Sequence, residues 1–80
     1  MKTISLEVVT PEKIAFKENV EFVVLPAEMG EMGVLPGHTP VLAHLAPGEL
    51  RITKDGNVKH FAVSGGFAEV HPDRVEVFAE

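Results

Sequence analysis

The stretch from position 30 to position 42 decides how this chain folds, and it reads Gly30-Glu31-Met32-Gly33-Val34-Leu35-Pro36-Gly37-His38-Thr39-Pro40-Val41-Leu42. Three glycines and two prolines surround one short apolar pair, Val34 and Leu35. Glycine supplies positive φ at turns, whereas proline fixes φ and removes a backbone donor. The pattern therefore predicts a backbone that turns twice around a short strand. An irregular backbone of this kind costs conformational free energy, so it is expected mainly where the function of the protein needs that shape.

Outside this stretch, apolar and polar residues alternate with a period of two, which is typical of half-buried strands. Leu50 and Ile52, for example, alternate with polar neighbours. Turn signals separate these runs, and Asp55-Gly56 is the strongest because Asp-Gly suits a type I′ hairpin. The one helix candidate is short and is closed by Pro47. We expect strands near 3–9, 13–17, 20–26, 32–35, 41–45, 48–54, 58–63, 67–71 and 74–79.

Length and composition predict a single domain spanning residues 1–80. The chain has no cysteine, so disulfides and thiolate-metal sites are excluded. A formal net charge of −5 without any basic run argues against nucleic-acid binding. Neither a signal peptide nor an apolar run of the roughly 18 to 20 residues that cross a bilayer is visible. We expect a soluble, cytoplasm-facing protein. Because 45% of so small a chain is apolar, we also expect a protein partner to cover part of it.

Residues 20–26 depart from the alternation because both faces of the expected strand are apolar. Val20, Phe22 and Val24 share one face, while Val23 and Leu25 lie on the other. Such a strand is either central and covered on both sides or in contact with a partner. We favour a central strand that a loop covers.

The sequence contains no recognisable catalytic or metal-binding constellation. Ser64 precedes Gly65-Gly66, but a nucleophile elbow requires a following helix, and none is expected. Glu28 and Glu31 flank a glycine loop without any sign of a shaped pocket. The histidines lack the clustering that metal ligands show; they are His38, His44, His60 and His71. We therefore expect no catalytic residue, no metal and no cofactor.

Residues 30–42 closely resemble a loop-strand-loop signature of the epsilon subunit of F-type, proton-translocating ATP synthases. Two further segments match in the family's order and spacing: Pro47-Gly48-Glu49-Leu50-Arg51-Ile52 and Val63-Ser64-Gly65-Gly66-Phe67-Ala68-Glu69-Val70. The likeness extends from about Leu6 to Ala79. It implies an all-β fold, a ten-stranded flattened β-sandwich of two five-stranded sheets, which corresponds to the family's N-terminal domain.

The resemblance also implies a non-catalytic part of the central stalk of a rotary ATP synthase. Its partners would be the gamma subunit, which forms the shaft, and the c-ring of the membrane. It would lie on the cytoplasmic face of a bacterial plasma membrane as a peripheral part of the complex. The implied c-ring contacts are Glu28, Met29, Gly30, Glu31 and Met32, and the implied gamma contacts are Thr10, His38, Thr39 and Ala43.

Family members commonly continue past Ala79 into a regulatory helical hairpin, whose functions are not carried over to a sequence that ends at Glu80. The alternative from another class is a lipoyl- or biotinyl-type carrier domain, a small acidic all-β module modified at a hairpin lysine. Lys54, beside Asp55-Gly56, is the only candidate for that modification. An enzyme on a jelly-roll scaffold ranks third because the histidines form no cluster.

Overall fold

The computed structural model describes residues 2–80, and in this range the chain forms nine strands and no helix. Nothing in that range is a helix long and apolar enough to cross a membrane. The strands are β1 (Ile4–Val9), β2 (Ile14–Val20), β3 (Phe22–Ala27), β4 (Gly30–Val34), β5 (Val41–Leu45), β6 (Gly48–Lys54), β7 (Asn57–Val63), β8 (Gly66–Val70) and β9 (Arg74–Ala79).

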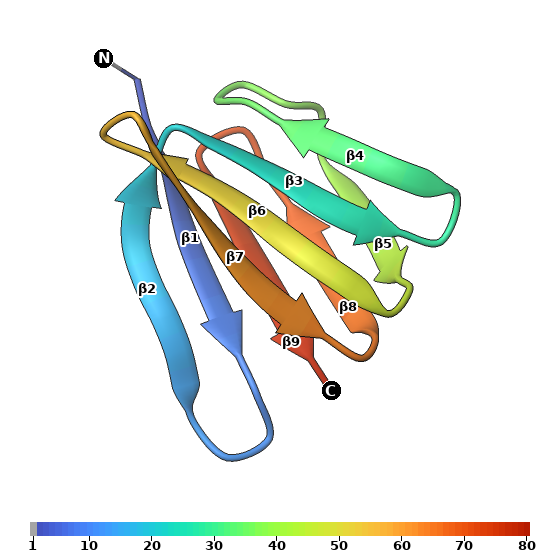
Figure 1. Cartoon of the computed structure of the whole chain (residues 1–80). Helices are drawn as coiled ribbons and strands as arrows, with labels where there is room; N and C mark the ends of the chain where they lie inside the picture. The colour runs from blue at the N-terminus through green and yellow to red at the C-terminus, as the bar shows by residue number, and fades with distance from the viewer. Residues whose placement is uncertain (1) are drawn as a thin grey trace.

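The strands form a β-sandwich in which one hydrogen-bonded path folds back on itself. The path runs β2-β1-β9-β8-β5-β3-β6-β7, and β4 pairs with β3 beside it. In Figure 1, β3, β6 and β7 cross in front of β1, β9 and β8, so the path forms two layers. The all-β class is confirmed. The expected ten strands in two five-stranded sheets are not confirmed, because residues 2–80 show nine strands, eight along this path and β4 beside β3.

The two layers are joined because β3 changes partner along its length. Phe22 to Val24 pair with β6, whereas Ala27 pairs with Leu45 of β5. Pro26 lies at the change and has no N–H to continue a ladder. Its carbonyl instead accepts a hydrogen bond from the Ala46 amide at 2.8 Å. One strand therefore belongs to both layers.

The core is the space between the layers, and inward side chains of nearly every strand fill it. On β1, Ile4, Leu6 and Val8 are fully buried while the intervening side chains are not. In the described part of the chain no polar or charged residue is buried as a whole. A core this apolar stabilises the domain through burial alone, at roughly 25 cal/mol per Å² of apolar surface.

Most expected strands are confirmed, and three agree at both ends: 41–45, 48–54 and 74–79. The Asp55-Gly56 hairpin is confirmed, since both residues have positive φ (52° and 78°), as a type I′ turn requires. The expected strand 20–26 is divided, because Val20 ends β2 and the chain bends at Glu21. β3 is nevertheless central, and the Phe22 ring lies against Gly33 of β4.

Candidate functional site

An exposed apolar row crosses the outer face of the layer formed by β1, β9, β8 and β5. In register, Val9 lies opposite Phe78, Phe78 opposite Phe67, and Phe67 opposite His44. The rings of Phe67 and Phe78 stack with their centroids 4.9 Å apart. Phe67 is 38% exposed, and nearby Leu42 is 57% exposed. We call Val9, Phe78, Phe67 and Leu42 the apolar face.

A second row on the same outer side is acidic. Glu7 lies opposite Glu76, and Glu76 opposite Glu69. Three carboxylates on adjacent strands repel one another unless cations balance them. Each has a basic side chain within 4 Å; the pairs are Glu7 with Lys17 (3.9 Å), Glu76 with Arg74 (3.5 Å) and Glu69 with His71 (3.9 Å). The apolar face is thus bordered by a row of carboxylates, each with a basic side chain beside it.

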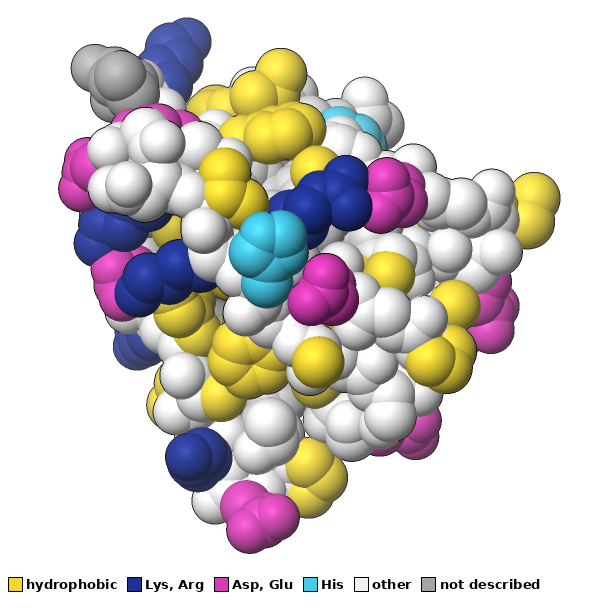
Figure 2. Space-filling view, in the orientation of Figure 1, with side chains coloured by type: hydrophobic (Ala, Val, Ile, Leu, Met, Phe, Trp, Pro, Cys, Tyr) yellow, Lys and Arg dark blue, Asp and Glu magenta, His cyan; other side chains and the backbone are white. Residues whose placement is uncertain are grey.

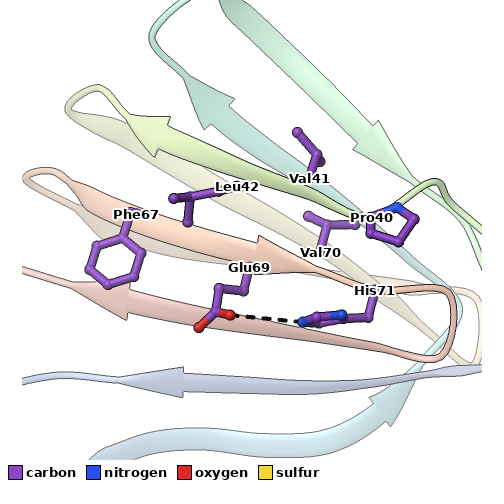
Figure 3. A pocket seen from close by; sticks show the side chains of 7 residues that line it. All are labelled: Pro40, Val41, Leu42, Phe67, Glu69, Val70 and His71. Atoms are coloured by element: carbon purple, nitrogen blue, oxygen red, sulfur yellow. Dashed lines mark ion pairs between the residues drawn. The ribbon is translucent and has the colours of Figure 1, made fainter.

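A hollow of about 460 Å³ lies beside Leu42 and Phe67. Figure 3 shows Phe67, Glu69 and His71 on one side of the β8 segment, with the imidazole directed at the carboxylate. The Nε2 atom of His71 is buried and lacks a hydrogen-bond partner among the described residues. A buried polar atom without a partner is costly, so this nitrogen is a candidate contact for a bound partner.

Thr10 lies at the other end of the apolar face, in the turn between β1 and β2. Its hydroxyl donates to the Lys13 carbonyl (3.1 Å) and accepts from the Lys13 amide (3.2 Å). With Val9, Phe67 and Phe78 it lines a second hollow of about 320 Å³. The turn is therefore held by its own hydroxyl, directly beside the exposed rings.

His38 and Thr39 lie in the loop between β4 and β5, near the hollow that holds His71. The Gly37 amide donates to the Pro72 carbonyl at 2.7 Å, which ties this loop to the turn between β8 and β9. The Nδ1 atom of His38 lies 2.7 Å from the Thr39 carbonyl. Thr10 and His38, both expected to face the shaft, thus flank the apolar face from opposite ends.

The turn between β3 and β4 and the first three residues of β4 carry the residues expected to contact the ring. Glu28 and Gly30 are exposed, and Met29 is completely exposed. Glu28, Met29 and Met32 line a third hollow of about 280 Å³ together with Ala43 of β5. The structure therefore brings Ala43, an expected shaft contact, next to the expected ring contacts.

Ala43 differs from the other expected contacts because its side chain is buried. It is 9% exposed and lies opposite Ala68 of β8. Its neighbours Leu42 and His44 point outward. Ala43 is therefore a minor part of the surface, as one of the residues that line the third hollow.

Glu31 forms a bidentate ion pair with Arg51. The Arg51 Nη1 atom lies 2.6 Å from Oε2, and Nη2 lies 3.0 Å from Oε1. The hydrogen bond and the charge of Arg51 lower the pKa of the Glu31 carboxyl below its usual value of 4.5. Figure 2 shows basic, histidine and acidic side chains gathered on this face of the molecule. Glu31 is therefore ionised and held rather than free.

Ser64 and Lys54, which were weighed as a nucleophile and as a carrier lysine, both have specific partners in the structure. The Ser64 hydroxyl donates to the Glu80 carbonyl at 2.8 Å, and the following segment is β8 rather than a helix. Lys54 is half-buried and its ammonium group pairs with Glu18, which does not present it as a free hairpin lysine. No group of three metal-ligating side chains occurs within residues 2–80.

Sequence reasoning missed the apolar face itself. Phe78 alternates with the buried residues of β9 and so has outward register on that strand. Phe67 and Leu42 have the same outward register on their strands. Apolar residues in outward register on three strands were the available signal, but only the topology shows that these strands are neighbours.

A small all-β sandwich with an exposed apolar face and an adjoining polar turn defines a class: a domain that docks onto other proteins. The family described as "ATP synthase, Delta/Epsilon chain, beta-sandwich domain" matches residues 3–80. The chain belongs to this family.

Curated relatives agree with this assignment. The chain is 45% identical to the ATP synthase epsilon chain of Bacillus subtilis over 80 residues, which are 100% of this chain and 61% of that protein. It is 49% identical to the ATP synthase epsilon chain of Anoxybacillus flavithermus, covering 100% of this chain and 60% of that protein. The chain therefore spans about three fifths of the length of these relatives.

Solved structures share the fold. A chain in the cryo-EM structure of Euglena gracilis mitochondrial ATP synthase, comprising OSCP, F1 and c-ring, matches with a TM-score of 0.92 and 30% identity, over 99% of this chain and 51% of that one. A chain in the central stalk and c-ring structure of the Tetrahymena thermophila mitochondrial ATP synthase matches with a TM-score of 0.74 and 24% identity, over 99% of this chain and 66% of that one. The second likeness concerns the fold alone.

Proposed function

We propose that this domain is a non-catalytic part of the central stalk of an F-type ATP synthase. It links the gamma shaft to the c-ring, so that both turn together and proton transport is coupled to ATP synthesis. The observation that carries the proposal is the apolar face, which lies beside an exposed polar turn on a domain of this family.

The apolar face is the surface that fits the shaft. Exposed aromatic side chains in the centre of a patch contribute most of the binding energy at protein interfaces. The stacked Phe67 and Phe78 supply such a centre, and the bordering carboxylates supply a polar rim that fixes orientation. Thr10 and His38 then contact the shaft at the two ends, while Ala43 contributes only at the hollow that it lines.

The segment 28–32, which comprises the turn between β3 and β4 and the start of β4, is the surface that fits the c-ring. It projects Met29 fully into solvent and offers the Glu28 and Glu31 carboxylates to polar loops. The third hollow joins this turn to β5, where the apolar face begins. The apolar face and this segment belong to one rigid sandwich with no long flexible loop between them. A rigid body attached at two surfaces can transmit torque from one partner to the other without slip.

The location follows from the assembly. A domain fastened to a membrane ring and to a soluble shaft is peripheral to the membrane. In a bacterium we place it at the cytoplasmic face of the plasma membrane. The domain requires no cofactor for this mechanical role.

The test separates the two surfaces by variant. Phe67→Glu puts a charge in the centre of the apolar face and should abolish capture by purified gamma subunit while capture by purified c-ring persists. Glu28→Lys should do the reverse. Val58→Glu is the matched control, since Val58 is an exposed apolar residue (52%) on β7, and it should bind both partners. If Phe67→Glu and Glu28→Lys both bind like the unchanged chain, the proposed function is wrong.

A further inference from the structure

The Glu31–Arg51 pair connects two strands that are not hydrogen-bonded neighbours. β4 pairs with β3, and β3 pairs with β6, so β3 lies between the two residues. Arg51 stands opposite Val24, and Glu31 stands opposite Pro26. The ion pair therefore crosses the outer side of β3 and ties β4 to the sheet at the side where the exposed turn begins.

The geometry of the pair fixes the carboxylate in one orientation. Both oxygens are engaged, each by a different guanidinium nitrogen, at 2.6 and 3.0 Å. This fork arrangement is specific to arginine, because its planar guanidinium matches a carboxylate, whereas a lysine ammonium offers only a point charge. A carboxylate held in this way leaves its remaining lone pairs facing solvent in a defined direction.

Two further polar side chains, Glu49 and His60, lie near Arg51. Glu49 adds a weaker attraction on the same strand and, like the Glu31 contacts, raises the pKa of the guanidinium. His60 of β7 lies opposite Arg51, with its Nδ1 atom 3.4 Å from Glu49. The Glu31–Arg51 pair thus lies beside a second polar pair, His60 with Glu49, on the same face.

We propose that Arg51 is a positioning residue for the ring contact, because it holds the Glu31 carboxylate in the orientation that the polar loops of the ring bind. This inference rests on the proposed function. A mobile glutamate must lose side-chain freedom on binding, whereas a held one has already lost it. Arg51 does not need to touch the ring for this effect.

The experiment is a double-mutant cycle measured as association of the 80-residue chain with immobilised, purified c-ring. Glu31→Gln removes the charge of the carboxylate but keeps the shape of the side chain. Arg51→Gln removes the guanidinium group that binds this carboxylate. We expect each variant to weaken ring association by about tenfold. The double variant should be no weaker than Glu31→Gln, because Arg51 acts through Glu31. Arg51→Lys should lie between Arg51→Gln and the unchanged chain.

Two controls separate positioning from a merely structural tie. Lys17→Gln removes one exposed basic side chain with an acidic partner on β1 and should leave ring association unchanged. The exchanged variant, Glu31→Arg with Arg51→Glu, restores an ion pair between β4 and β6. It should recover the urea midpoint of unfolding but not ring association. Recovery of ring association would overturn the inference, because a structural tie alone would then suffice.

The outcomes also separate the inference from the function on which it rests. If Glu31→Gln weakens ring association and Arg51→Gln does not, the inference is overturned and the proposed function stands. Additive losses in the double variant overturn it as well, because Arg51 then acts on its own. If neither single variant changes ring association, the ring contact at Glu31 itself is refuted, and the inference is refuted with it.

Discussion

The ring of Phe67 stacks on that of Phe78 across β8 and β9, with centroids 4.9 Å apart and planes 24° apart, although Phe67 is 38% exposed. In an isolated monomer these rings would leave apolar surface in contact with water, and exposed apolar patches of this kind mark interaction sites. We therefore expect Phe67→Ala to weaken gamma binding by about 2 kcal/mol. The free energy of unfolding should fall by only about 1 kcal/mol.

Titration calorimetry with purified gamma subunit measures the first quantity, and urea unfolding measures the second. Val58→Ala is the control, since it truncates an exposed apolar residue on β7. Equal losses of gamma binding in both variants would show that the apolar face is not the shaft contact.

A methyl group at Gly66 should be among the most damaging single changes in the chain. Gly66 has φ of +118°, and a Cβ added there would lie 2.1 Å from the Phe78 carbonyl oxygen. Backbone strain and steric overlap combine, so Gly66→Ala should lower the free energy of unfolding by about 3 kcal/mol or more.

Gly37→Ala separates these two causes. Gly37 also has positive φ (+88°), but a Cβ there would meet nothing within 4 Å. Strain alone should cost about 1 kcal/mol. Thermal unfolding of both variants provides the comparison, and equal melting temperatures would contradict the close approach to Phe78.

Ala43 and Leu42 are neighbours on β5, and charged replacements should affect different properties. Ala43→Lys forces a long, charged side chain against Ala68, so it should destabilise the domain by about 3 kcal/mol or more. Leu42→Lys places the same charge in solvent and should change stability by under about 0.5 kcal/mol, while weakening gamma binding. Urea unfolding with a parallel gamma pull-down distinguishes them. Loss of stability in Leu42→Lys alone would contradict the assigned register of β5.

The acid side of the stability profile should report two ion pairs. The Lys54 hydrogen bond lowers the pKa of Glu18, and the Arg51 hydrogen bond lowers the pKa of Glu31, each from 4.5. A carboxyl whose pKa is lower in the folded state stabilises the fold above about pH 4.5, and this contribution is lost as the pH falls through the folded-state value.

The stability advantage of the unchanged chain over Glu18→Gln or Glu31→Gln should accordingly be largest at neutral pH and shrink below pH 4.5. Both pairs remain accessible to solvent, so the advantage itself is small. Chemical unfolding at a series of pH values measures it. An advantage that grows as the pH falls would have the wrong sign and would refute the ionised pairs.

Local patterns were sufficient for the strands and the tight turns. Alternation located β5, β6 and β9 at both ends, and Asp55-Gly56 located the hairpin, because a strand period and a positive φ are properties of neighbouring residues. The motif from Gly30 to Leu42, together with the matching segments at 47–52 and 63–70, was sufficient for the family. The division near Val20 was missed, since a continuous apolar run hides a bend at Glu21.

Only the tertiary structure decided which outward residues meet. β1 and β9 lie at opposite ends of the chain but pair in parallel, which places Val9 beside Phe78 and Glu7 beside Glu76. The Glu31–Arg51 pair likewise joins residues twenty positions apart across an intervening strand. The sequence determined each strand and the direction in which its side chains point, because these depend on the local period. The apolar face and the held carboxylate depend on strand order and register, which arise from long-range pairing and burial of the shared core.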